Sequence, residues 1–106
     1  MSVAVALLGT MLILINPHPT GASIAISQRN RQFNPGTLSI RSGDVVTVVN
    51  DDGDLHHHAY VSSPDFKFDS GDQAPNSRTD IVFSTPGHFL VLCGIHPKMR
   101  LAVTVK

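Results

Sequence analysis

The sequence predicts an all-β fold, a Greek-key β-sandwich or barrel of about seven to eight short strands. From position 23 onward, apolar residues recur mostly at every second position, in short runs separated by Gly, Pro, Asn and Asp. This part of the chain shows no sustained period of about 3.6 residues, which an amphipathic helix would require. The 106 residues, 42% of them hydrophobic, are enough for one compact domain with a single core.

Three strands are expected in the first half of this domain. Residues 24–26 and 38–40 alternate apolar with polar or small side chains, and turn-forming residues follow each segment. Residues 45–49 are nearly all β-branched, which suits a strand buried on both faces of a sheet. The sequence Asn-Asp-Asp-Gly-Asp at 50–54 is a strong turn signal that ends this strand.

The strands expected in the second half are residues 59–61, 81–83, 88–93 and 101–105. Turn signals between residues 62 and 76 predict a loop in the middle of the chain. Alternation places Phe89, Val91 and Cys93 on one face of their strand. The last strand alternates in the same way, so both strands are expected to bury one face in the core.

The first 22 residues differ in composition from the rest and predict a signal peptide. Residues 1–15 are almost wholly apolar or small, Asn-Pro-His-Pro interrupts them, and small residues follow up to Ala22. Cleavage there leaves a domain of residues 23–106 in a periplasmic or otherwise exported protein. A membrane anchor through residues 1–15 and a buried helix are the alternatives, but this run is shorter than the roughly 20 residues needed to span a bilayer.

Charge and cysteine content narrow the class of protein. Eight basic and eight acidic residues give a formal net charge of zero, which argues against a nucleic-acid binder. The single cysteine, Cys93, excludes an intrachain disulfide. A lone cysteine in an exported protein indicates a metal ligand or a reactive thiol.

The segment from Cys93 to Met99 carries the strongest chemical signal. Cys93, His96 and Met99 stand three residues apart, between two expected strands. A thiolate, an imidazole and a thioether form a soft ligand set that suits copper, especially Cu(I). Two histidines, one cysteine and a weak axial methionine are the ligand set of blue-copper electron-transfer sites. Each residue alone fits a packing or surface role, but together they favour a metal site that needs a second imidazole.

The second imidazole is expected in the run His56, His57 and His58, just after the turn at 50–54 and at the start of a strand. Three adjacent histidines also fit a solvated patch or an adventitious site for Zn²⁺ or Cu²⁺. The residues alone therefore leave each of the three open as the ligand.

The residues most similar to a known family are Phe33 with Pro35, Leu38 with Ile40, Gly43 to Val46, Val49 to Asp52, His56 to His58, Phe68 to Gly71, Phe83, Pro86-Gly87 and Cys93 to Met99. On these residues the chain resembles the cupredoxins, in particular amicyanin and plastocyanin, over residues 33–105. The spacing Cys-x-x-His-x-x-Met, with Pro97 directly after the histidine, is similar to the short ligand loop of amicyanins. The sequence of residues 57–60 resembles small periplasmic cupredoxin-like proteins associated with methylamine utilisation.

The resemblance implies one type 1 copper ion, cycling between Cu(II) and Cu(I), with His57, Cys93, His96 and Met99 as ligands. In the family, the first ligand histidine usually precedes a residue such as Asn and then an inward apolar residue. Matching Ala59 to that apolar position selects His57, whereas counting six residues from Asn50 selects His56. With His57 as ligand, His58 occupies the place where relatives often carry Asn.

The function implied by the resemblance is outer-sphere electron transfer by a small monomer without enzymatic activity or a small-molecule substrate. Redox proteins such as a dehydrogenase or a c-type cytochrome are the expected partners, and His96, flanked by Ile95 and Pro97, is the expected exit for the electron. A copper chaperone or storage protein is the main alternative, since it could use the same soft ligands. A copper enzyme would need a second metal centre and a longer chain, and a cysteine hydrolase leaves Met99 unexplained.

Overall fold

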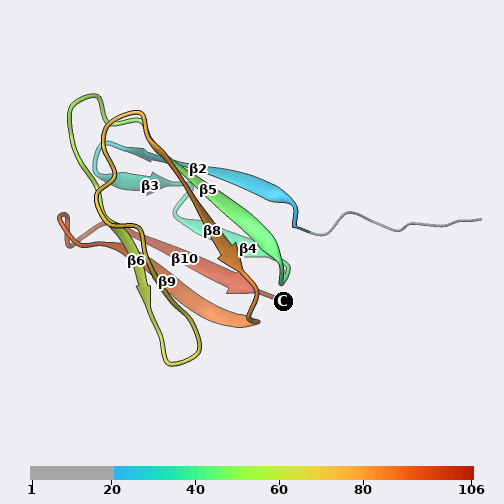
Figure 1. Cartoon of the computed structure of the whole chain (residues 1–106). Coiled ribbons are helices and arrows are strands. Elements are labelled where there is room, and N and C mark those ends of the chain that lie inside the picture. The colour runs from blue at the N-terminus through green and yellow to red at the C-terminus, as the bar shows by residue number, and fades with distance from the viewer. Residues whose placement is uncertain (1–20) are drawn as a thin grey trace, which may run out of the picture.

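The computed structural model describes residues 21–106, and these residues form an all-β domain (Figure 1). The expected leader at residues 1–22 therefore lies almost wholly outside the described residues. The nine strands of this part are β2 (Ser23–Arg29), β3 (Gln32–Asn34), β4 (Thr37–Ile40), β5 (Asp44–Asn50), β6 (Ala59–Ser62), β7 (Lys67–Asp69), β8 (Arg78–Phe83), β9 (Gly87–Cys93) and β10 (Arg100–Val105). Among residues 21–106, no helix is long and apolar enough to cross a membrane.

The strands form two sheets, which Figure 1 shows as two layers. One sheet has five strands in the order β4-β10-β9-β6-β7, and the other has four in the order β3-β2-β5-β8. The pairs β2–β5 and β4–β10 are parallel and the remaining pairs are antiparallel. Neighbours in each sheet are often distant in sequence, so the predicted Greek-key sandwich is confirmed.

The core lies between the two sheets and follows the predicted alternation. Phe89, Val91 and Cys93 on β9 are all buried, and the alternate residues of β10 are buried as well. On β8, Ile81 is fully buried while the next residue, Val82, is 51% exposed. Burial of one large apolar side chain contributes about 1.5–3 kcal/mol.

Two short strands, β3 and β7, occur where the sequence predicts turns and a loop. β3 pairs with β2 through a two-residue turn in which Asn30 and Arg31 both have positive φ, of 56° and 54°. Such values match the twist of a tight hairpin, and Asn is among the residues that tolerate them. β7 pairs with β6. Each has only three residues, so pairing with a longer neighbour stabilises it more than its own apolar pattern does.

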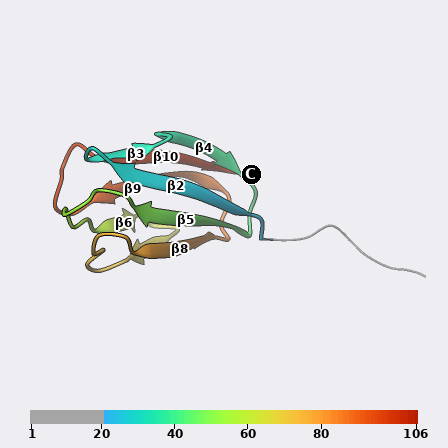
Figure 2. The same ribbon diagram turned by 90° about the horizontal axis from the view of Figure 1, so that it is seen from above.

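Three connections gather at the end of the sandwich opposite the C-terminus (Figure 2). They are the β2–β3 turn, the β5–β6 loop with the three histidines, and the β9–β10 loop that follows Cys93. Adjacent strands β6 and β9 bring the last two together, since Ala59 pairs with Cys93. The topology thus places the histidine run beside the Cys93–Met99 segment.

Candidate metal centre

The expected ligands come from two loops and the strand ends that hold them. His57 precedes β6 and forms an isolated antiparallel bridge with Gln73, with backbone N···O distances of 3.0 and 2.8 Å. Cys93 is the last residue of β9, and His96 lies in the loop that follows. Met99 precedes β10, is 1% exposed, and donates its backbone N–H to the His96 carbonyl at 3.0 Å.

His57, Cys93 and His96 converge on one point. His57 Nδ1 lies 3.1 Å from His96 Nδ1, and Cys93 Sγ lies 3.8 Å from the first nitrogen and 3.7 Å from the second. A triangle with these sides has a point about 2.1 Å from all three corners, which matches ordinary bonds from a metal ion to imidazole nitrogen and thiolate sulfur. The two nitrogens and one sulfur also match the donor types of a blue-copper site. The cluster therefore fits one type 1 copper ion.

His57 is the residue of the histidine run that joins this cluster. Its side chain is fully buried, and so is Ala59 two residues later, on the same side of the strand. The side chains of His56 and His58 are 52% and 33% exposed. Their rings bind carboxylates instead: His56 Nδ1 lies 2.8 Å from Asp72, and His58 Nε2 lies 2.6 Å from Asp69.

Asp52 fixes the orientation of the His57 ring. His57 Nε2 lies 2.7 Å from Asp52 Oδ2, so an N–H at Nε2 donates to the carboxylate and the Nδ1 lone pair faces Cys93 and His96. The same carboxylate accepts the backbone N–H groups of Asn30 at 2.6 Å and Arg31 at 3.2 Å. Burial alone would raise the pKa of Asp52, but the hydrogen bonds from His57, Arg31 and Asn30 outweigh it and hold this pKa below its ordinary value. Asp52 is therefore anionic beside the cluster.

The Cys93 sulfur is buried and accepts a hydrogen bond from the backbone N–H of His58 at 3.4 Å. Gly94 in turn donates its backbone N–H to the His58 carbonyl at 2.8 Å. The two ligand-bearing loops are thus joined by the main chain of His58. Hydrogen bonds to a ligating sulfur tune the reduction potential of a metal site.

His96 lies at the boundary between the cluster and solvent, with its ring half-buried. Burial is the main cause that lowers the pKa of His96, and the charges of His57 and Arg31 lower it further. A neutral imidazole can offer its nitrogen as a ligand, whereas an imidazolium cannot.

Sequence reasoning missed Asp52, Asp69 and Gln73 as parts of the site. Gln73 closes the bridge to His57, and its side-chain oxygen accepts the backbone N–H of Ala59 at 3.0 Å. In the sequence, Asp52 is one residue of a turn signal and of a segment that carries the family resemblance, but neither observation assigns it a role at the site. Its contact with His57 depends on the path of the β5–β6 loop, and the spacing of residues in the sequence does not predict that path.

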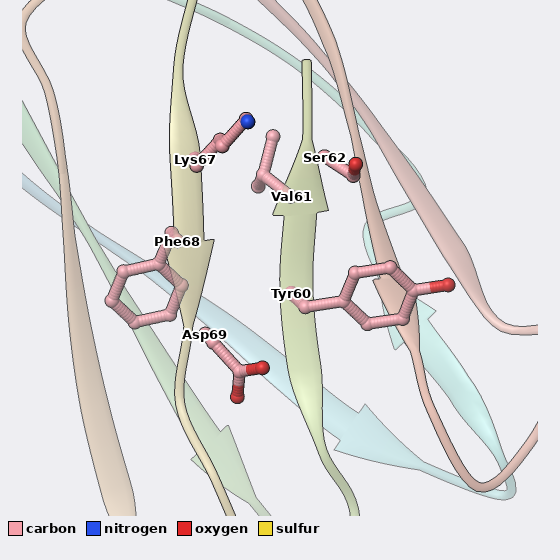
Figure 3. Close-up of a pocket in the computed structure, with 6 residues that line it drawn as sticks. All are labelled: Tyr60, Val61, Ser62, Lys67, Phe68 and Asp69. Carbon is pink, nitrogen blue, oxygen red and sulfur yellow. The ribbon is translucent and has the colours of Figure 1, made fainter. Parts of the chain in front are cut away.

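A hollow lies over the β6–β7 hairpin (Figure 3). Its lining is Tyr60, Val61, Ser62, Lys67, Phe68 and Asp69. Figure 3 shows Lys67 and Asp69 at opposite ends of this hollow. The Asp69 carboxylate is engaged by His58 and by the backbone N–H of Gly71 at 2.8 Å. The Lys67 and Asp69 side chains do not point to a common centre. The group of His57, Cys93 and His96 therefore remains the candidate functional site.

Comparison with solved structures identifies the fold. A reduced variant of amicyanin superimposes with a TM-score of 0.72 at 21% identity, covering 81% of this chain and 83% of that chain. The copper-containing nitrite reductase NirK of Thermus scotoductus gives a TM-score of 0.71 at 27% identity, covering 87% of this chain but only 23% of the reductase. The chain therefore has the cupredoxin fold, and its cluster of two histidines and a cysteine lies at one end of that fold. Its fold is similar to that of amicyanin in particular.

One curated protein is similar to the chain in sequence. The methylamine utilization protein MauL of Methylorubrum extorquens is 33% identical over 72 residues, which are 67% of this chain and 61% of MauL. The chain thus spans about three fifths of that relative's length. No model of a protein family matches the chain.

Proposed function

We propose that the protein is a small copper electron carrier in which His57, Cys93 and His96 would hold one type 1 copper ion, with Met99 as the fourth ligand. The observation that carries this proposal is the triangle of two Nδ1 atoms and one Sγ, with sides of 3.1, 3.7 and 3.8 Å. Met99 is buried and lies in the β9–β10 loop with His96. Copper supplies a one-electron couple between Cu(II) and Cu(I) when bound.

The residues around the cluster are arranged to keep the donor atoms still. Asp52 holds the His57 ring, the bridge to Gln73 holds the His57 backbone, and the His58 N–H holds the Cys93 sulfur. Little then has to move when an electron arrives or leaves, which is the requirement for fast outer-sphere transfer. His96 reaches the surface and is the exit for the electron.

The proposal extends to the biological process in which the protein acts and to its redox partners. The relative is named as a methylamine utilization protein, so redox proteins of that process, such as a dehydrogenase or a c-type cytochrome, are the proposed partners. An exported, periplasmic location and a monomeric state belong to this proposal. The nitrite reductase neighbour is an enzyme by name, but the chain matches only 23% of it, and we assign no enzymatic activity to the single cluster described here.

Copper storage or delivery is the second candidate function, because His56 and His58 supply extra imidazoles beside the cluster. Among residues 21–106, however, only His57 of this run lies in the group of donor atoms with Cys93 and His96, while the side chains of His56 and His58 are 52% and 33% exposed. The structure therefore favours the carrier.

Cyclic voltammetry of the copper-loaded full chain tests the function. An electron carrier gives a reversible one-electron wave, whereas a storage protein binds Cu(I) tightly without a fast reversible couple. His57→Ala is expected to abolish the wave, and the matched variant His56→Ala is expected to keep it. Loss of the wave in both variants, or in neither, would contradict the ligand assignment.

A further inference from the structure

The side chain of Gln73 is buried behind the metal cluster and joins the two sheets of the sandwich. It is 1% exposed, although Gln73 lies in the connection between β7 and β8. Its Oε1 accepts the backbone N–H of Ala59 in β6 at 3.0 Å, and its Nε2 donates to Thr79 Oγ1 in β8 at 2.9 Å. Because β6 and β8 belong to different sheets (Figure 1), this one amide ties the sheets together next to the β5–β6 loop.

Gln28, near the end of β2, supports this amide. Its side chain is fully buried, and its Nε2 donates to Gln73 Oε1 at 2.9 Å. A backbone N–H such as that of Ala59 can only donate, so the Gln73 atom beside it is the oxygen, and the Gln28 atom that meets this oxygen is the NH₂ nitrogen. The main chain therefore determines the orientations of both amides.

Stability alone does not account for Gln28. Its Oε1 has no hydrogen-bond partner among the residues that the structure describes, and an unpaired buried acceptor costs stability. An apolar side chain of similar size at this position would avoid that cost. The buried amide adds a directed hydrogen bond instead, and networks of such bonds hold their members in one arrangement.

Both amides act on His57 through the main chain. The Gln73 backbone exchanges two hydrogen bonds with His57, at 3.0 and 2.8 Å, so the side-chain contacts of Gln73 also hold the β5–β6 loop. The Gln28 carbonyl accepts the backbone N–H of Asp51 at 2.9 Å. Asp51 precedes Asp52, whose carboxylate orients the His57 ring. The network thus restrains both the main chain and the ring of His57.

We propose that Gln73 is a positioning residue of the metal centre, with Gln28 as its support. Together they hold His57 at the distance from the other two donor atoms that a copper ion requires. This inference rests on the proposed electron-carrier function and assigns a role to two buried amides that bind no metal. In an electron carrier, a histidine held in one place suits both Cu(II) and Cu(I), so little has to move during transfer.

Hydrogen exchange of the copper-free full chain, labelled with ¹⁵N, tests the positioning role without the metal. In Gln73→Met, the His57 amide is expected to exchange about tenfold faster relative to the amides of β9 and β10, because opening of the loop no longer breaks the side-chain hydrogen bonds. The Met99 amide, which donates to the His96 carbonyl on the other side of the cluster, should show no such relative change. An equal change at all of these amides, or no change, would overturn the proposal.

Gln28→Met is the milder variant, because the hydrogen bond between Gln73 and Ala59 remains. Its midpoint of urea unfolding is expected to equal or exceed the native value, since the unpaired Oε1 is removed, while exchange at His57 still becomes about threefold faster. Gln32→Met, the same change at an exposed glutamine of β3, is the matched control and should alter neither quantity. A lower midpoint in Gln28→Met without faster exchange at His57 would show a purely structural role and contradict the proposal.

Copper affinity separates this inference from the proposed function. Competition titration of Cu(I) against a chromophoric chelator is expected to show about tenfold weaker binding by Gln73→Met, because ordering of the loop then opposes binding. Gln32→Met should keep the native affinity at a temperature where all the proteins are folded. Native affinity in Gln73→Met as well would overturn the positioning role alone. A copper-loaded native chain without a reversible wave would overturn the carrier function, and this inference with it.

Discussion

Asp52 is the single residue outside the ligand set that most affects how the cluster is arranged. Its carboxylate accepts hydrogen bonds from His57, Asn30 and Arg31, and its own backbone N–H donates to the Asn50 side chain at 3.0 Å. An anionic acceptor behind a ligating imidazole fixes its tautomer and raises its basicity. Loss of that charge should therefore change metal binding as well as stability.

We expect Asp52→Asn to weaken copper binding by about 10- to 100-fold, the usual cost of losing such an outer partner. The reduction potential should rise, because a less basic His57 stabilises Cu(II) less than the native residue does. The copper-free protein should lose about 1–3 kcal/mol of unfolding free energy, since buried donors lose a charged acceptor. Competition titration, voltammetry and urea unfolding measure the three quantities.

The control for this prediction is Asp51→Asn, which changes the neighbouring exposed carboxylate that binds Ser27. It should leave copper affinity and potential close to those of the native protein. An effect of Asp51→Asn equal to that of Asp52→Asn would show that general charge, not the contact with His57, is responsible.

At the scale of elements, the site depends on contact between the β5–β6 loop and the end of β9. The backbone of His58 bonds both the Cys93 sulfur and the Gly94 N–H, and the His58 ring packs over Gly94. A Cβ added to Gly94 would lie 2.8 Å from His58 Nδ1. Asp69 binds the other side of this ring at 2.6 Å, so a shift of the ring away from Gly94 would disturb that hydrogen bond.

We expect Gly94→Ala to destabilise the copper-free protein by about 1–3 kcal/mol through this clash. Adding His58→Ala should restore part of the loss, giving a coupling free energy of at least about 0.5 kcal/mol in a double-mutant cycle. Urea unfolding of the four proteins measures this coupling.

Gly53→Ala is the matched control, since an added Cβ there meets no atom within 4 Å, and its stability should change little. Strict additivity of Gly94→Ala and His58→Ala would contradict the proposed packing of the two loops.

At the scale of the whole molecule, the sandwich brings three connections to one end and leaves His96 at the surface there. The all-β class and the buried faces of β9 and β10 were predictable, because alternation reflects burial on one side of a sheet. The prediction that His57 faces the site followed from the same alternation, since His57 and the buried Ala59 share one side. The assignment of His57, Cys93, His96 and Met99 as the copper ligands stays a prediction.

Other features were not predictable from the sequence, for physical reasons. β3 and β7 have three residues each and depend on pairing with neighbours distant from their own local pattern. The contact between Asp52 and His57 depends on the path of the β5–β6 loop. Arg31 lies near His96 because the β2–β3 turn has positive φ at Asn30 and Arg31. The sequence indicates only that these residues form a turn.

The measurement that tests the central claim most directly is the visible absorption spectrum of the full chain after addition of one equivalent of Cu(II). Thiolate bonded to Cu(II) gives an intense charge-transfer band, so the native protein should be strongly coloured, with one copper bound per chain. Cys93→Ser should lose this band, because the sulfur that supplies the transferred electron density is gone. A native protein without the band, or a Cys93→Ser variant that keeps it, would contradict the assignment of His57, Cys93, His96 and Met99 as a type 1 copper site.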